Sequence, residues 1–330
     1  MLEKHEEGRW QSIDLEDLPN KIRDDAVLWI DAEDLSEEET KTLKEHFALD
    51  ELNLEALTEE GRRSKIDEHE DTVSCFVSFP KREDFVAEAK MNWLALFVGK
   101  RWIVTVHNGH SDITCAVFKK ISTHGYFALS LSPSTDTLMY VFLDLIANEY
   151  FLVSDALHEK LQKLSKEAGR LFRERPRQSG ANFGLEIAKS RDQVLYLRQS
   201  IGPLREIVGR ITRGEFALIS SNTISRFEDL YDRTISLIEV VDNHREEIHD
   251  IGDILINVQT LTTNNIIRVL TIISAIFLPL ALIAGIYGTN FGGGFSIPGS
   301  NDNYGFYVMV VIMLGIAFSL LAVFRRKGWL

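Results

Sequence analysis

Two long apolar segments near the C-terminal end of the chain constrain the fold most. Val269 to Ile286 has 18 residues, Tyr304 to Phe324 has 21, and neither contains a charged side chain. As helices they would reach ~27 and ~32 Å, enough to cross a hydrocarbon core of ~30 Å. A buried hairpin of a soluble protein is the alternative, but such hairpins are rarely this long and this free of charge. We therefore expect two transmembrane helices.

The charges around these segments predict their orientation. Arg268 precedes the first segment, and residues 325–327 (Arg-Arg-Lys) follow the second, as part of a basic tail, 325–330. The intervening loop, 291–303, carries only Asp302 as a charge. Because basic residues favour the cytoplasmic side, we expect both termini in the cytoplasm and the loop outside. This predicts a multi-pass protein in contact with the lipid of a plasma membrane, a bacterial or archaeal inner membrane.

Length, charge and motif content limit the functions that the rest of the chain could have. The 330 residues suffice for a cored soluble domain in addition to two spans, and the net charge of -13 argues against a nucleic-acid partner. Met1 to Pro19 is charged throughout, so we expect no signal peptide. The sequence contains no nucleophile and base pair, no metal-hydrolase motif and no nucleotide loop. We therefore expect neither an enzyme nor a bound cofactor.

The region 1–134 is expected to form a cytosolic α/β domain. Helices are expected at Ser36 to Phe47, which opens with an acidic first turn, and at Asp112 to Thr123. Short runs rich in Val, Ile, Phe and Trp predict strands. These runs are Ala26 to Ile30, Val73 to Phe79, Trp93 to Val98 and Trp102 to Val106.

The region 135–220 is expected to be a cytosolic helical region. One helix is expected from Leu138 to about Arg175 and another from Phe183 to about Thr212, with Pro203 interrupting or kinking it. The region 221–290 follows as a stalk helix that continues into the first span, with its membrane part at about 268–288. From Ser221 to Gly285 this helix contains only one internal glycine and one proline, so it could be ~65 residues and roughly 100 Å long.

A stripe of small, polar and aliphatic residues recurs along this helix with a mean spacing of 3.5, the period of helices wound left-handedly on each other. Its members are Asp253, Asn257, Thr260, Asn264, Ile267, Thr271, Ser274, Leu278, Ala281, Gly285 and Gly288. A face that meets lipid would be uniformly apolar. The alternative is ordinary helix packing through small and hydroxyl residues.

One chain with two spans cannot enclose a water-filled path, so a pore requires several copies. Each hydroxyl or carbonyl on the stripe would then recur as a ring of oxygen ligands, which suits hydrated divalent cations and Mg²⁺ above all. Asn290 would contact the hydration shell at the mouth, and Ile267, Leu270 and Leu278 would form apolar constrictions that close the path by excluding water.

Four stretches carry a resemblance to a known family. They are 226–233 (RFEDLYDR), 264–271 (NNIIRVLT), 276–291 (IFLPLALIAGIYGTNF) and 325–330 (RRKGWL). They resemble the CorA family of divalent-cation channels, including its zinc-transporting ZntB branch. The resemblance implies a funnel-shaped homopentamer in which an α/β cytosolic domain feeds long helices, with two transmembrane helices per chain and a central pore from the first span, 304–324 being the second.

The resemblance also implies roles for particular residues. Gly288, Thr289 and Asn290 match the outer filter, which is Gly-Met-Asn in the magnesium channels, so Thr289 leaves Mg²⁺, Zn²⁺, Co²⁺ and Ni²⁺ open as the transported ion. Asn290 and Asp253 are expected to contact the hydrated ion, Asp253 from an acidic ring in the cytosolic vestibule. The expected pore-lining set is Asp253, Asn264, Ile267, Leu270, Thr271, Ser274, Leu278 and Tyr287.

A regulatory cation site is implied at Asp229 and Glu55, where channels of this family sense intracellular Mg²⁺ between subunits. The usual Glu-Asp pair reads Glu55-Ala56 here, so one carboxylate is lost and the sensor is expected to be incomplete. The alternative is that Asp229 and Glu55 are simply solvated.

Two function classes remain open from the sequence. The leading one is passive or proton-linked transport of a divalent cation, and the other is a CorA-fold membrane scaffold or regulatory protein with little conduction. His244 and His249 are five residues apart, which turns them ~140° apart on a helix, so we interpret both as surface histidines.

Overall fold

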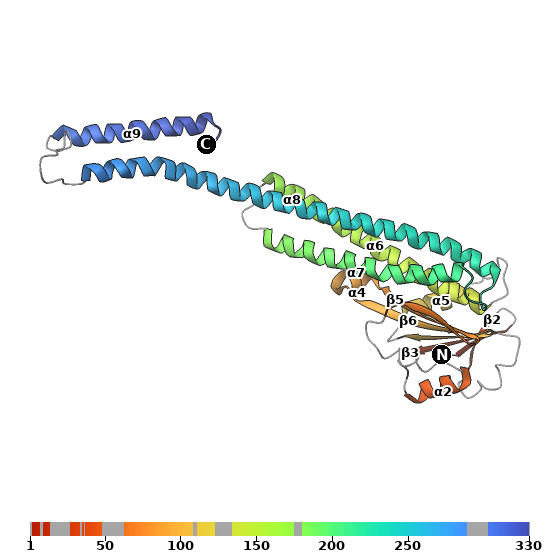
Figure 1. The fold of residues 1–330 in the computed structure, drawn as a ribbon. Helices are drawn as coiled ribbons and strands as arrows, with labels where there is room; N and C mark the ends of the chain where they lie inside the picture. The colour runs from red at the N-terminus through yellow and green to blue at the C-terminus, as the bar shows by residue number, and fades with distance from the viewer. Residues whose placement is uncertain are drawn as a thin grey trace. The chain divides into compact units, whose positions relative to one another are not determined.

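The computed structural model describes residues 2–6, 9–13, 27–33, 35, 37–47, 63–107, 111–122, 134–174, 180–288 and 303–329. The chain divides into two compact units. Unit 1 comprises residues 1–168 and 178–252, and unit 2 comprises residues 169–177 and 253–330. Figure 1 shows the helices and strands from which they are built.

The first part of unit 1 mixes strands with short helices, and the described elements that follow are all helices. In chain order the elements are β1 (Leu2–Glu6), β2 (Arg9–Ile13), β3 (Leu28–Glu33), α2 (Glu37–Phe47), β4 (Lys65–His69), β5 (Thr72–Pro80), α4 (Arg82–Glu88), β6 (Met91–Val98), β7 (Trp102–His107), α5 (Asp112–Ser122), α6 (Thr135–Glu174), α7 (Gly180–Thr212), α8 (Ser221–Gly288) and α9 (Asn303–Arg326). The α/β domain, the long helix and the two apolar C-terminal segments are confirmed.

The strands form one seven-stranded sheet in the order β2-β1-β3-β7-β6-β5-β4. Only β3 and β7 pair in parallel, and every other neighbouring pair in the sheet is antiparallel. The four expected strands are β3, β5, β6 and β7. The other three, β1, β2 and β4, are short and carry polar or charged residues at most positions, so the apolar pattern of a core strand is missing from them.

Both faces of the sheet are covered, and the core of unit 1 lies on each side of it. On one face Leu28, Ile30 and Val104 pack with Leu43 and Phe47 of α2. On the other face Trp29 contacts Phe142 of α6 edge to face, with ring centroids 5.6 Å apart. Figure 1 shows the sheet between α2 and the helices α6 and α7.

The β6–β7 hairpin depends on Gly99. Its N–H donates to the Trp102 carbonyl oxygen over 2.8 Å. A Cβ at position 99 would lie 2.4 Å from the Trp102 indole, so any larger residue would displace that ring.

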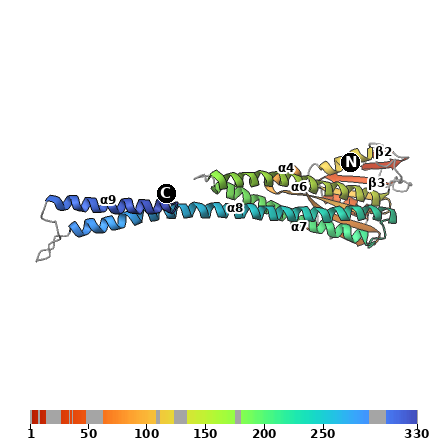
Figure 2. The same ribbon diagram turned by 90° about the horizontal axis from the view of Figure 1, so that it is seen from above.

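Three helices, α6, α7 and the first part of α8, lie side by side in both views (Figures 1 and 2). Buried Tyr150 of α6 donates its hydroxyl to the Ser78 carbonyl of β5 over 2.7 Å and lies 3.3 Å from the Ser200 carbonyl of α7. Arg198 of α7 donates to Asp242 of α8 over 2.8 Å. These contacts join the sheet and the three helices into one body.

Two expectations for these helices need correction. Of the two effects expected of Pro203, an interruption is wrong, since α7 is one helix of 33 residues with Pro203 inside it, and a kink stays a prediction. Helix α6 begins at Thr135 and not at Leu138, because Asp136 accepts a hydrogen bond from the N–H of Thr137 over 2.8 Å and so satisfies a donor of the first turn.

Unit 2 is dominated by the end of α8 and by α9. Within the described residues, three helices are long and apolar enough to cross a membrane, namely α8, α9 and part of α6. The apolar window of α6 is 61% buried, as befits a core helix, whereas the windows of α8 and α9 are 6% and 0% buried. Within unit 2, α9 returns alongside the last part of α8 (Figures 1 and 2).

Candidate pore helix

Helix α8 supplies every described residue of the expected pore. It has 68 residues and contains Pro279. Its start is capped, since the N–H and the hydroxyl of Ser220 both donate to Asp136 of α6, over 3.0 and 2.7 Å. Although burial would raise the pKa of Asp136, hydrogen bonds from Ser134, Ser220 and Thr223 outweigh it and lower the pKa below its usual value.

The first part of α8 has a buried face. Its buried apolar residues recur at helical spacing through Phe227, Leu230, Leu237, Val241, Ile248 and Ile251. Beyond Gly252 this burial ends, and between positions 253 and 288 only Ile272 is buried. One helix therefore has two environments, a packed segment in unit 1 and a segment in unit 2 that is exposed on nearly all sides in the single chain.

The polar residues of the expected pore lining are all exposed on this second segment. They are Asp253, Asn264, Thr271 and Ser274. The Thr271 hydroxyl donates to the Ile267 carbonyl of the preceding turn over 2.8 Å, and Thr260 does the same to Ile256 over 2.9 Å. Each of these hydroxyl hydrogens is donated within the helix, so the lone pairs of the oxygens remain available outside it. They can accept hydrogen bonds from the water molecules around a hydrated cation.

The expected constriction residues are large apolar side chains that the single chain leaves uncovered. The exposed fractions are 55% for Ile267, 62% for Leu270 and 76% for Leu278. Gly285 and Gly288 have open space where a Cβ would stand, so no contact within the described part of one chain requires glycine there. Tyr287, one residue before the end of α8, is half-buried.

The expected filter and sensor fall partly outside the described residues. Gly288 is the last residue of α8, whereas Thr289 and Asn290 lie outside the described ranges, as do Glu55 and Ala56. Asp229 is exposed on α8. The filter and the regulatory pair thus stay predictions.

His244 is not the surface histidine that the sequence predicted. It is 5% exposed, its Nε2 lies 3.1 Å from the Ser154 hydroxyl of α6, and its ring stacks on His158 with centroids 5.4 Å apart. Burial and the neighbouring charge of His158 lower the pKa of His244, outweighing Ser154 and Asp155. His249, in contrast, is exposed as expected. The partner of His244 lies on another helix, which spacing along α8 alone could not reveal.

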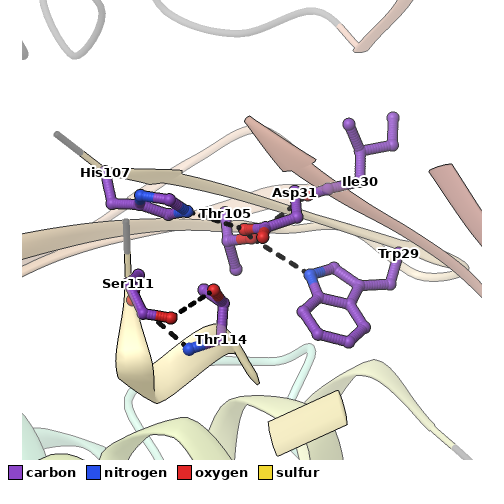
Figure 3. Close-up of polar contacts among 7 residues, drawn as sticks. All are labelled: Trp29, Ile30, Asp31, Thr105, His107, Ser111 and Thr114. Carbon is purple, nitrogen blue, oxygen red and sulfur yellow. Dashed lines mark hydrogen bonds and ion pairs between the residues drawn. The ribbon is translucent and has the colours of Figure 1, made fainter. Parts of the chain in front are cut away.

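A second polar cluster that sequence reasoning missed lies in the sheet (Figure 3). Trp29 donates its indole N–H to the Thr105 hydroxyl over 3.0 Å, and that hydroxyl reaches both the Ile30 carbonyl and the Asp31 carboxylate. His107 Nε2 lies 3.2 Å from Asp31 Oδ1. These contacts cross the parallel β3–β7 pair and fix its register.

The chain has an α/β unit, and α8 leads from it into two exposed apolar segments, one in α8 itself and one in α9. This is the organisation of an integral membrane protein with a large extramembrane part. The model of the CorA-like Mg²⁺ transporter protein family matches residues 24–326. The chain therefore belongs to the CorA family, and its N-terminal domain is cytoplasmic with two spans in the inner membrane.

Relatives of known name agree with this assignment. The cobalt/magnesium transport protein CorA of Thermotoga maritima is 26% identical over 87% of this chain and 78% of its own length. The zinc transport protein ZntB of Pectobacterium carotovorum is 26% identical over 53% of this chain and 50% of its own. The complete structure of the CorA magnesium transporter of Methanocaldococcus jannaschii superposes with a TM-score of 0.83 over 100% of this chain and 98% of that one, at 22% identity, and so shows the same fold.

Proposed function

We propose that this protein conducts divalent metal cations across the membrane through a central pore that α8 of several identical subunits lines, in a homopentamer of funnel shape as the family resemblance implies. The observation that carries the proposal is the second segment of α8, which exposes an oxygen-bearing stripe beside large apolar side chains. The apolar faces of this segment can contact lipid, whereas the oxygen-bearing stripe cannot do so favourably. If several copies turn this stripe toward a shared axis, the stripe is removed from lipid and lines a pore.

A ring of these stripes would supply the oxygen ligands that a hydrated divalent cation requires. Asn264, Thr271 and Ser274 would present neutral oxygens once per subunit, and Asp253 would add a ring of negative charge at the cytoplasmic approach. Gly288, Thr289 and Asn290 would form the outer filter beside Tyr287, with Asn290 touching the hydration shell. We assign the chain no catalytic role.

The transported ion is one of Mg²⁺, Co²⁺, Ni²⁺ and Zn²⁺. The relatives are named for cobalt and magnesium in one case and for zinc in the other. Thr289 stands where the magnesium channels carry methionine, so the filter of this chain does not settle the choice between them.

The test is uptake of each ion into proteoliposomes, measured across pH and membrane voltage against empty liposomes. We expect entry of at least one of the four ions. Absence of flux for every ion at every pH and voltage would contradict transport and favour a scaffold or regulatory role.

The Asn290→Ala variant locates the filter in the same assay. It removes the only filter side chain with a carbonyl oxygen, so we expect uptake to be abolished while the oligomer stays intact by gel filtration. Flux equal to that of the unmodified protein would show that the ion is not recognised at Asn290.

A further inference from the structure

Two histidines and a glutamate meet in unit 1, far along α8 from the expected filter. His158 comes from α6, and His244 and Glu247 come from α8. One ligand atom from each of the three side chains lies within 4.8 Å of the other two. His244 and Glu247 are three residues apart, which places them on one face of the helix.

The side chains around this cluster are arranged as in a metal site. His158 Nδ1 lies 3.7 Å from Glu247 Oε2, while His158 Nε2 lies 2.8 Å from the amide nitrogen of Gln162. Ser154 holds the buried ring of His244 from the other helix. When Nδ1 of His158 binds an ion, Nε2 carries the hydrogen, so the Gln162 amide would have to turn and accept it through its oxygen, as acceptors do that orient imidazole ligands in known metal sites.

The three side chains of this cluster can also move close enough together to coordinate one ion. Tetrahedral ligands at about 2.0–2.1 Å from Zn²⁺ stand roughly 3.4 Å apart, so the three groups need to approach by about 1 Å. His158 and Glu247 can make that movement, because their side chains are 48% and 30% exposed, while buried His244 supplies the fixed point.

We propose that His158, His244 and Glu247 bind a transition-metal dication, Zn²⁺ in particular, with water as the fourth ligand. Two imidazoles and one carboxylate match the ligand preference of Zn²⁺, and Co²⁺ and Ni²⁺ share it. Mg²⁺ prefers oxygen ligands alone and is excluded. The bound ion would tie α6 to the packed segment of α8. This proposal stands independently of transport, since it concerns binding to unit 1.

The test uses the full-length protein in detergent, with Co²⁺ as a spectroscopic probe and Zn²⁺ competing against a chromophoric chelator. Tetrahedral Co²⁺ absorbs visible light strongly, whereas hydrated Co²⁺ held by pore oxygens absorbs weakly. We expect the strong bands in the unmodified protein, displacement by Zn²⁺, no displacement by excess Mg²⁺, and a higher melting temperature with Zn²⁺.

His158→Ala and Glu247→Gln are the informative variants, because both side chains are partly exposed and their loss should leave the fold intact. Each variant should lose the strong Co²⁺ absorption bands and should bind one Zn²⁺ fewer per chain than the unmodified protein. His249→Ala and Glu246→Gln, exposed positions of the same helix, are the matched controls and should retain both. Unchanged Co²⁺ bands in both informative variants, or displacement by Mg²⁺, would overturn the proposal whatever the flux assay shows.

Discussion

At the scale of single residues, Asp136 joins the starts of two helices. Its carboxylate accepts hydrogen bonds from Thr137 in α6 and from the N–H and hydroxyl of Ser220 before α8. We expect Asp136→Ala to destabilise unit 1 by about 2–3 kcal/mol, since two caps and a buried partner are lost together. Thermal unfolding of the full chain in detergent would measure it, with exposed Asp192→Ala of α7 as the control.

The same residue predicts a pH dependence. Because the pKa of Asp136 is lowered in the folded state, its stabilisation is fully present above the unfolded value of about 3.9 and is lost as the pH falls through the lower folded value. The melting temperatures of the unmodified protein and Asp136→Asn should therefore differ at neutral pH and converge in acid. A constant difference down to the lowest accessible pH would show that the charge of Asp136 is irrelevant.

The buried environment of His244 could not be predicted from the sequence. Its spacing from His249 correctly separates these two side chains, but burial and the contact with His158 arise from packing of α6 on α8, across 86 residues of sequence. The Asp31–His107 contact depends likewise on pairing of β3 with β7. Contacts of this kind are fixed by tertiary structure, and no local pattern encodes them.

At the scale of elements, strongly periodic or apolar segments were predictable and polar ones were not. The strands β5, β6 and β7 are apolar runs that are buried on both faces, so composition alone marks them. The edge strand β4 reads Lys-Ile-Asp-Glu-His, and its pairing with β5 provides the order that its composition does not predict. The continuity of α8 was predictable because, before Gly285, it contains a single glycine and a single proline.

A gate within α8 is the prediction that belongs to this scale. If Ile267 and Leu270 close the pore by excluding water, Ile267→Asn and Leu270→Asn should wet the constriction and raise the resting conductance about tenfold, equivalent to about 1.4 kcal/mol off the barrier. Planar bilayer recordings would measure it. Val269→Asn, at an exposed position on another face of the helix, should leave the conductance low. If neither of the first two variants leaks, the closure lies elsewhere, and Leu278 is the next position to test.

At the scale of the whole molecule, regulation depends on contacts between subunits. Asp229 is exposed in the single chain, and the Asp of the usual Glu-Asp pair is replaced by Ala56. We expect millimolar Mg²⁺ neither to close the channel nor to protect the cytoplasmic part from protease, because a carboxylate is missing from the site. Ala56→Asp should restore part of both responses. Strong closure of the unmodified protein by Mg²⁺ would mean that other acids, Asp232 among them, complete the sensor.

The central claim is that one stripe of α8 lines a conducting pore. Single cysteines along α8, placed in a Cys115→Ser background, test it through block of ion flux by a membrane-impermeant thiol reagent. Cys75 can stay, since burial raises the pKa of its thiol and keeps it unreactive. Flux is read in proteoliposomes with the ion that the unmodified protein transports best.

If α8 lines the pore, we expect block at Ile267→Cys, Thr271→Cys, Ser274→Cys and Leu278→Cys, with the period of 3.5 residues that a shared axis imposes. Cysteines at Val269 and Ile273, which are exposed on the opposite side of the helix, should react without block or fail to react at all. Block that follows this opposite side, or reaction along the whole stripe with flux unchanged, would contradict the claim that α8 lines the path of the ion.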